Sequence, residues 1–200
     1  MATTREIVLA SGNAGKLAEF RTLFDDAGWQ LRPQSGFNVP DAEETGQTFI
    51  ENAILKARHA ARLTGLPALA DDSGLCVDAL GGAPGLHSAR YSGTHGDHAA
   101  NIDKLLKAMA GVPDARRGAR FVCVLALLRH ADDPQPLIAE GLWEGRIQHA
   151  RSGEGGFGYD PVFFVPEHGM SAAELPAEVK HRSSHRARAM ALLAQRLAAL

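Results

Sequence analysis

The segment LPALADDSG, residues 66–74, places two adjacent carboxylates directly after a short apolar run. The run predicts a buried β-strand, and α/β proteins bind metal ions and phosphates at the carboxyl ends of such strands. Carboxylates are costly to place beside a core without a partner, so a bound cation is one interpretation. Asp, Ser and Gly are also common turn formers, so the segment alone leaves a metal site and a strand-to-turn exit equally open.

The composition is that of a globular protein with a sizeable core. The chain has 200 residues, of which 45% are hydrophobic and 22% charged, with a net charge of -2. This length predicts one domain, or one domain with two lobes. No stripe of Lys and Arg indicates a nucleic-acid polymer as partner, and no apolar run is long enough to span a membrane. A polar N-terminus and two widely separated cysteines favour a cytoplasmic protein.

Helical and strand patterns alternate along the rest of the chain. Apolar runs predict further strands at residues 6–10, 30–32, 120–129, 136–147 and 162–165. Helical periodicity predicts helices at residues 16–27, 48–63, 97–109 and 184–200. The second of these opens with a Thr48–Glu51 capping box and ends at Gly65. Its inward face should consist of Ile50, Ala53, Ile54, Ala57 and Ala61. Interleaved helices and strands predict the α/β class.

The first predicted turn, SGNAGK at residues 11–16, has the features of an anion site. It is not a Walker A motif, because Ala10 and Leu17 stand where that motif requires Gly and Ser or Thr. The free backbone N–H groups of a helix start still favour an anion. A lysine in the first turn, Lys16, is unfavourable unless a negative ligand offsets it. The structural alternative is a Gly/Asn turn followed by a solvated lysine.

A helix face and an acidic loop lie close to each other in the sequence. Asn52 and Lys56 are four residues apart and therefore share one face of the second predicted helix. Glu43 and Glu44 in the preceding loop could add oxygen ligands for a magnesium ion, for which Asp72 alone is too few. On its own, each pair is more often a solvated surface than a functional site.

Two later segments offer aromatic rings and hydrogen-bond donors. In GEGGFGYDP, residues 153–161, Phe157 and Tyr159 could stack on a flat ligand such as a base, or could fill the core. The segment KHRSSHR, residues 180–186, could be a basic helix flank or the edge of a donor-rich pocket. Such a pocket would accept a 6-keto purine and disfavour the 6-amino group of adenine.

Taken in order, these segments resemble the inosine/xanthosine triphosphate pyrophosphatase family. The matching motifs span most of the chain: SGNAGK (11–16), AEETGQTFIENAILKA (42–57), LADDSGL (69–75), LGGAPG (80–85), SARYSG (88–93), GGFGYDP (155–161) and SHR (184–186). The resemblance implies one domain over residues 1–200, a two-lobed fold around a long mixed sheet with the nucleotide in a cleft between the lobes, and a homodimer. It also implies magnesium-dependent hydrolysis of dITP, ITP and XTP to the monophosphate and pyrophosphate, which cleanses the nucleotide pool.

The resemblance further implies roles for individual residues. Asp72 would be the catalytic carboxylate that orients or deprotonates the attacking water and contacts the metal, with Glu43 or Glu44 as the second metal ligand. Ser73 would contact the substrate. The triphosphate would be held by Lys56 and by the first turn, which consists of Ser11, Gly12, Asn13, Ala14, Gly15 and Lys16. The base and sugar would be surrounded by Phe157, Gly158, Tyr159, Asp160, Lys180, His185 and Arg186.

Three other functions fit parts of the same pattern. The nearest is a pyrophosphatase for other modified nucleotides, and the most different is a non-catalytic nucleotide sensor. A haloacid-dehalogenase-type phosphatase would need a second aspartate two residues after Asp72, where Gly74 stands. The product formed from a nucleoside triphosphate separates these functions. A pyrophosphatase releases pyrophosphate, a phosphatase releases orthophosphate, and a sensor leaves the nucleotide intact.

Overall fold

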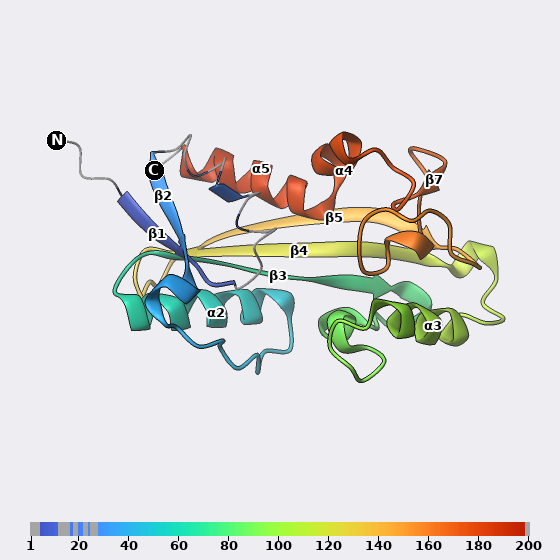
Figure 1. Ribbon diagram of the computed structural model, residues 1–200, viewed down its shortest axis with the longest axis horizontal. Helices are drawn as coiled ribbons and strands as arrows, with labels where there is room; N and C mark the ends of the chain where they lie inside the picture. Colours follow the sequence, from blue (N-terminus) through green and yellow to red (C-terminus); the bar gives the residue numbers. More distant parts are fainter. Residues whose placement is uncertain (1–4, 12–16, 18–19, 22–23, 25–27, 199–200) are drawn as a thin grey trace. The chain divides into compact units, whose positions relative to one another are not determined.

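A computed structural model describes residues 5–11, 17, 20–21, 24 and 28–198. In this part of the chain, seven strands form one mixed sheet in the order β2-β1-β3-β4-β5-β6-β7, with helices against its faces (Figure 1). The strands are β1 (Arg5–Leu9), β2 (Trp29–Pro33), β3 (Ala68–Val77), β4 (Gly118–Leu128), β5 (Leu137–Ile147), β6 (Phe163–Val165) and β7 (Met170–Ser171). The helices are α2 (Phe49–Thr64), α3 (His98–Ala108), α4 (Ala177–Ser183) and α5 (His185–Leu197). The predicted α/β class is confirmed.

Parallel and antiparallel pairing coexist in this sheet. β1 pairs in parallel with both β2 and β3, whereas β6 pairs antiparallel with β5 and β7. The predicted helix at residues 16–27 lies largely outside the described residues, although Leu17, Phe20, Arg21 and Phe24 are helical. None of the helices in the described ranges is long and apolar enough to cross a membrane.

The chain divides into two compact units, each with its own hydrophobic core. Unit 1 contains Met1–Asp72, Cys123–Gly141 and Arg188–Leu200, and unit 2 contains Ser73–Val122 and Leu142–Ala187. The boundaries fall inside β3, β4, β5 and α5, so these elements contribute residues to both units.

In unit 1, α2 and α5 cover opposite faces of the strands (Figure 1). The capping box is confirmed, because the Thr48 hydroxyl accepts the Glu51 backbone N–H and Gly65 ends α2 in the left-handed conformation. The buried residues of α2 are Asn52, Ala53, Ala57, Ala60 and Ala61. The prediction that Ile50 faces inward is wrong: it is 40% exposed, because it lies in the first turn, ahead of the first core position.

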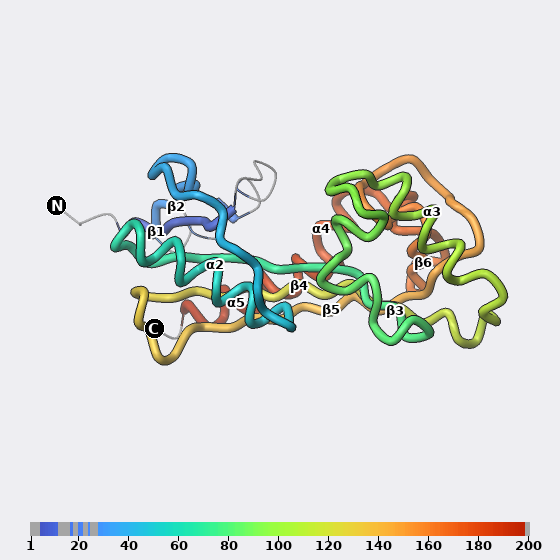
Figure 2. Tube along the Cα trace, turned by 90° about the horizontal axis from the view of Figure 1, so that it is seen from below, coloured from blue at the N-terminus to red at the C-terminus, as the bar shows by residue number. Residues whose placement is uncertain are grey.

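In unit 2, α3 contributes Ile102 and Leu105 to a core that includes Trp143 and Phe163. The segment η3 (Gly85–Arg90) lies beside α3 in both views (Figures 1 and 2). The short helix α4 was missed in the sequence, where only a basic flank before the last helix was recognised. Its seven residues have no buried member, so no apolar period marks it.

The strand that carries Asp71 and Asp72 is longer than its sequence predicts. β3 continues through Asp71–Gly74 to Val77, so the alternative of a strand-to-turn exit is wrong. Because β3 lies between β1 and β4 in the sheet, strand pairing overrides the turn preference of Asp, Ser and Gly. The parallel partner β1 does end here: its last residue, Leu9, is paired with Leu69. The two aspartates therefore lie just beyond the carboxyl end of β1.

Candidate active site

The carboxylate of Asp72 is placed by β3 at the point where the neighbouring strand β1 stops. Asp71 is only 2% exposed and Asp72 is half-buried, with 13% of its side chain exposed. Successive side chains of a strand point to opposite faces, so Asp71 and Asp72 are directed to different sides of the sheet. Asp72 is the carboxylate that meets the side chains of α2.

Lys56 links Asp72 to the acidic loop before α2. Its Nζ lies 2.9 Å from Oδ1 of Asp72 and 3.0 Å from Oε1 of Glu44. The lysine side chain is 16% exposed, so this ammonium group is largely removed from water while it contacts two carboxylates. Hydrogen bonds between charged groups are stronger than those between neutral groups, which stabilises this arrangement.

Asn52 occupies the same face of α2, one turn before Lys56. It is 2% exposed, its Nδ2 donates to Oδ2 of Asp72 at 3.4 Å, and its Oδ1 accepts the backbone N–H of Gly46 at 2.8 Å. The alternative of a solvated helix face for Asn52 and Lys56 is therefore wrong. Gly46 was not among the predicted site residues. The only sequence signal for its contact is that Asn52 lies in the first turn of a capped helix, within reach of the preceding loop.

The surroundings of Asp72 change its proton affinity. Burial raises the pKa of Asp72, while the Lys56 ammonium and the Asn52 amide lower it and Glu44 raises it further; the net shift is upward. For Lys56, burial lowers the pKa, but the carboxylates of Asp72, Asp71 and Glu44 outweigh burial and the net pKa is raised. The lysine therefore stays charged at neutral pH, and Asp72 is a stronger base than an ordinary aspartate.

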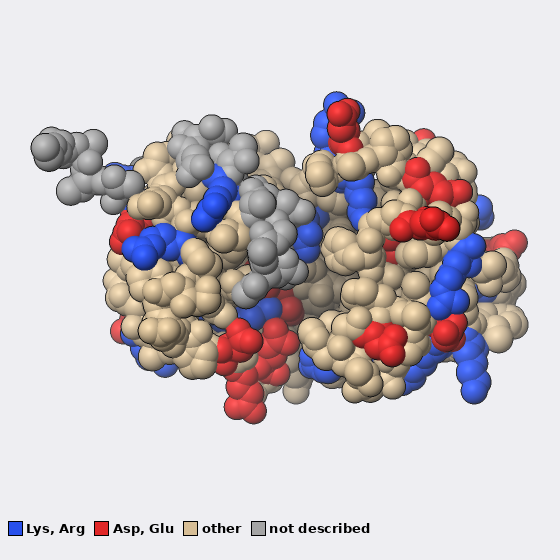
Figure 3. All heavy atoms as spheres, viewed as in Figure 1, with Lys and Arg blue, Asp and Glu red and all other residues tan. Residues whose placement is uncertain are grey.

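The two glutamates of the acidic loop are placed differently. Acidic side chains gather on the surface over the loop that precedes α2, where Asp41, Glu43 and Glu44 are exposed (Figure 3). Of these, Glu44 contacts Lys56 and so belongs to the cluster around Asp72. Glu43 shows no such contact with Lys56.

The donor set around Lys56 fits a magnesium ion that also binds phosphate oxygens. In the described ranges, no three His, Cys, Asp or Glu side chains come together as a metal cluster. Asp72 and Glu44 nevertheless both contact one positive charge, the Lys56 ammonium. Magnesium is commonly held by one or two carboxylates, with water and substrate phosphates completing its octahedral shell.

A second cluster of predicted residues lies in unit 2. Lys180 donates to Oδ2 of Asp160, which also accepts the backbone N–H of Phe157 at 2.8 Å. The Lys180 Nζ lies 5.0 Å from the centre of the Phe157 ring, and this residue is 58% exposed. Glycine is required at Gly156, because its φ is +75° and a Cβ there would clash with the Asp160 carboxylate. The loop thus presents an aromatic face beside a charged donor.

Other predicted residues of unit 2 belong to its core. Tyr159 is 4% exposed and donates its hydroxyl to the Ser88 carbonyl at 2.9 Å, so of the two interpretations of its ring, core filling is correct. Burial raises the pKa of the Tyr159 hydroxyl. The His185 ring, 9% exposed, stacks on the Phe121 ring with 5.0 Å between centroids. Arg186 is half-buried.

The remaining predicted residues follow β1, lie within β3, lie in the Phe157 loop or are not described. Ser11 is half-buried and follows β1 by two residues. Gly12, Asn13, Ala14, Gly15 and Lys16 lie outside the described residues. Ser73 is half-buried and follows Asp72 along β3. Gly158 has a φ of +62°, which glycine adopts without strain.

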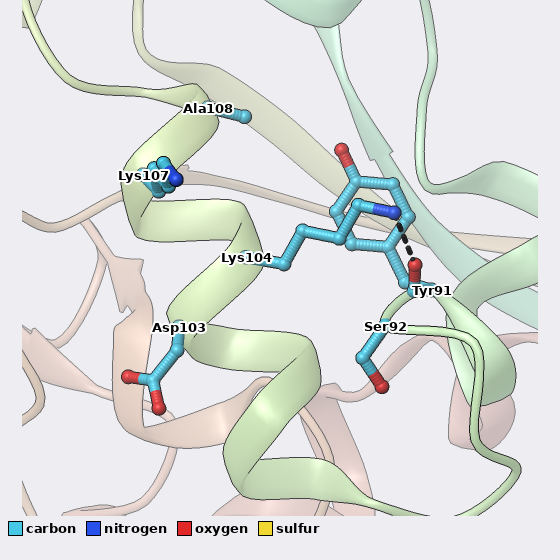
Figure 4. A pocket seen from close by; sticks show the side chains of 6 residues that line it. All are labelled: Tyr91, Ser92, Asp103, Lys104, Lys107 and Ala108. Carbon is cyan, nitrogen blue, oxygen red and sulfur yellow. Dashed lines mark hydrogen bonds between the residues drawn. The ribbon is translucent and has the colours of Figure 1, made fainter.

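A hollow beside α3 in unit 2 contains none of the predicted site residues (Figure 4). Its volume is about 760 Å³, and it is lined by Tyr91, Ser92, Asp103, Lys104, Lys107 and Ala108. Lys104 lies over the Tyr91 ring at 4.6 Å and donates to the Tyr91 carbonyl at 2.7 Å (Figure 4). These contacts attach the loop after η3 to α3.

The fold and the first cluster define an α/β protein with a lysine held between two carboxylates beside the end of a parallel strand. The chain belongs to the Ham1 family, whose family model matches residues 7–196. It is 60% identical over 196 residues to the dITP/XTP pyrophosphatase of Methylococcus capsulatus, covering 98% of both chains. It is 62% identical over 197 residues to the dITP/XTP pyrophosphatase of Pseudomonas aeruginosa, covering 98% of this chain and 99% of the relative.

A solved structure supports the same assignment. The HAM1 protein of Coxiella burnetii superimposes with a TM-score of 0.94 at 52% identity, covering 98% of this chain and 100% of that protein. The predicted membership of the inosine/xanthosine triphosphate pyrophosphatase family, and the predicted mixed sheet, are confirmed by these comparisons.

Proposed function

We propose that this protein hydrolyses dITP, ITP and XTP to the nucleoside monophosphate and pyrophosphate. The observation that carries the proposal is the placement of one half-buried lysine between Asp72 and Glu44, beside the end of β1. Such a cluster suits a polyphosphate chain with its counter-cation. The substrate class is supported by the relatives of more than half-identical sequence that are named dITP/XTP pyrophosphatases.

Water would attack the α-phosphorus while the bond from that phosphorus to the bridging oxygen breaks, so that pyrophosphate leaves. Asp72 orients this water and accepts its proton, a role that suits a carboxylate whose pKa is raised by burial. Lys56 binds phosphate oxygens and neutralises their charge. Magnesium, held by Asp72 and Glu44, would supply further positive charge to the triphosphate.

Selection of the base is assigned to the second cluster. The exposed ring of Phe157 is suited to stacking on a base, and Lys180 beside it is a donor suited to a 6-keto oxygen. His185 and Arg186 are assigned to the same subsite through the family resemblance. That resemblance also leads us to propose a homodimer, and the polar N-terminus with two widely separated cysteines leads us to propose the cytoplasm as its location.

A panel of nucleotides tests this function. Purified protein with magnesium is given dITP, ITP, XTP, GTP, ATP or UTP, and both pyrophosphate and orthophosphate are measured. We expect pyrophosphate as the product, with kcat/KM at least about 100-fold higher for ITP and XTP than for ATP, since a site that donates a hydrogen bond to the 6-keto oxygen strongly rejects a base that lacks it. Equal rates on ATP or UTP would contradict the base selectivity, and release of orthophosphate or intact nucleotide would contradict the reaction.

A further inference from the structure

Asn52 is the side chain that touches both the carboxylate of β3 and the loop before α2. It is 2% exposed, so its amide has little access to water and depends on protein partners. Its Nδ2 donates to Asp72 and its Oδ1 accepts from the backbone of Gly46. One planar amide therefore sets the distance between Asp72 and the loop that carries Glu44.

Gly46 makes this contact possible because it has no side chain. A Cβ at Gly46 would lie 2.6 Å from Oδ1 of Asn52 and 2.7 Å from the Cβ of Glu51, both far inside normal contact distance. The loop therefore approaches α2 as closely as its backbone permits. Thr48 and Glu51 hold the next part of the loop, since Oε2 of Glu51 accepts the backbone N–H of Gln47 at 2.7 Å.

We infer that Asn52 is a positioning residue that holds Asp72 and the Glu44 loop in one arrangement around Lys56. The inference rests on the proposed function, since it assigns Asn52 to the same site. Asn52 contacts no reacting atom in this role; it acts through the two carboxylates. Groups that orient metal-binding carboxylates typically change activity or metal affinity by about 10- to 100-fold when replaced.

The two contacts of Asn52 can be separated by substitution. Asn52→Asp keeps an oxygen that accepts the Gly46 N–H but loses the donor to Asp72 and adds a like charge beside it. Asn52→Ala loses both contacts. Asn101 provides the matched control, since it is also 2% exposed, accepts the Ser92 backbone N–H at 2.6 Å and donates to the Ala89 carbonyl, a neutral group.

The experiment measures kcat, KM for dITP and the unfolding temperature of wild type, Asn52→Asp, Asn52→Ala and Asn101→Ala. Amide hydrogen exchange of the peptide containing Gly46 is measured without substrate or metal. We expect kcat to fall about 10- to 100-fold in both Asn52 variants, with KM changed less than about threefold. Exchange at Gly46 should become faster in Asn52→Ala and stay slow in Asn52→Asp.

Asn101→Ala should unfold at a lower temperature while kcat stays within about twofold of wild type. The inference is overturned if Asn52→Asp keeps wild-type kcat, or if exchange at Gly46 is unchanged in Asn52→Ala. Failure of the wild type to release pyrophosphate would overturn the proposed function instead, and the exchange measurement would still test the contact. Should Asn52→Ala not fold, Asn52→Asp retains the side-chain volume and decides the kinetic part.

Discussion

The starts of α2 and α3 have the same construction and opposite surroundings. Each helix begins after a side-chain cap, Thr48 in one and Asp97 in the other, which accepts a backbone N–H of the first turn. Each places a fully buried asparagine at its fourth position, and that asparagine accepts a backbone N–H from a loop. A lysine follows within one turn on each helix.

The difference lies in what these donors meet. Asn52 and Lys56 of α2 donate to the carboxylate of Asp72, whereas Asn101 and Lys104 of α3 donate to main-chain carbonyls. A carbonyl is neutral and cannot take up a proton, so the α3 contacts can only attach a loop. A half-buried carboxylate between donors can change its charge and bind a cation. The same helix start therefore attaches a loop in unit 2, whereas in unit 1 it holds a carboxylate that can bind a cation.

The largest expected effect on activity comes from removing the charge of Asp72, the carboxylate that accepts from Asn52 and Lys56. Asp72→Asn should retain the circular dichroism spectrum of the wild type and lose about two orders of magnitude or more in pyrophosphate release from dITP. The control is Asp103→Asn on α3, which loses an ion pair with Arg151 in which the Asp103 side chain is 67% exposed; surface pairs contribute little. Near-normal release by Asp72→Asn would contradict the assignment of Asp72.

The two lysines provide the next comparison. Lys56→Met removes a charge that binds two carboxylates and should reduce kcat/KM about 10- to 100-fold, as expected for charge-assisted hydrogen bonds. Lys104→Met removes an exposed lysine bound to a carbonyl and should stay within about twofold. Steady-state kinetics on dITP measure both variants. Equal losses of kcat/KM would show that the charge of the group bound by each lysine does not determine the role of that lysine.

Lys56 also contacts Glu44 of the acidic loop before α2, and Lys104 of α3 makes no such contact with an acidic loop among the described residues. Glu44→Gln should raise the magnesium concentration for half-maximal rate about tenfold, the lower end of the effect of altering a metal-binding group. Glu43→Gln is the matched variant, since Glu43 does not contact Lys56, and a smaller shift is expected. A magnesium titration of the rate measures both, and an equal or larger shift in Glu43→Gln would assign the metal to Glu43.

The smallest expected effect concerns Glu51, the third residue of α2. This residue has no counterpart in α3, where Ala100 occupies the corresponding position. The Gln47 backbone N–H and the Thr48 hydroxyl lower the pKa of Glu51. Ionised Glu51 therefore stabilises the fold above the ordinary glutamate pKa, and this contribution is lost as the pH falls through the lowered pKa. Glu51→Gln should unfold at a lower temperature than wild type at about pH 7, and at the same temperature near about pH 2.

Thermal unfolding at both pH values measures this difference. Glu144→Gln, on an exposed position of β5, serves as the control and should match the wild type at both. A difference for Glu51→Gln that does not depend on pH would show that the side-chain charge is not its cause.

Much of the fold could be predicted because its signals are local. The Thr48–Glu51 box and Gly65 mark the ends of α2, and apolar runs mark β4 and β5. The extent of β3 could not be predicted, since turn-forming residues become a strand only when neighbouring strands pair with them. The four-residue spacing of Asn52 and Lys56 predicted a shared face, but not that this face meets Asp72.

By itself, the sequence determined the α/β class, the family motifs and the residue types available for a phosphate site, since all of these depend on chemistry and periodicity along the chain. The tertiary structure alone decided that Lys56 donates to Asp72, and that Glu44 and not Glu43 joins them. It also decided that Tyr159 fills the core. The physical reason is that burial, strand direction and charge contacts are set by residues distant in the sequence, which the order of residues alone does not bring together.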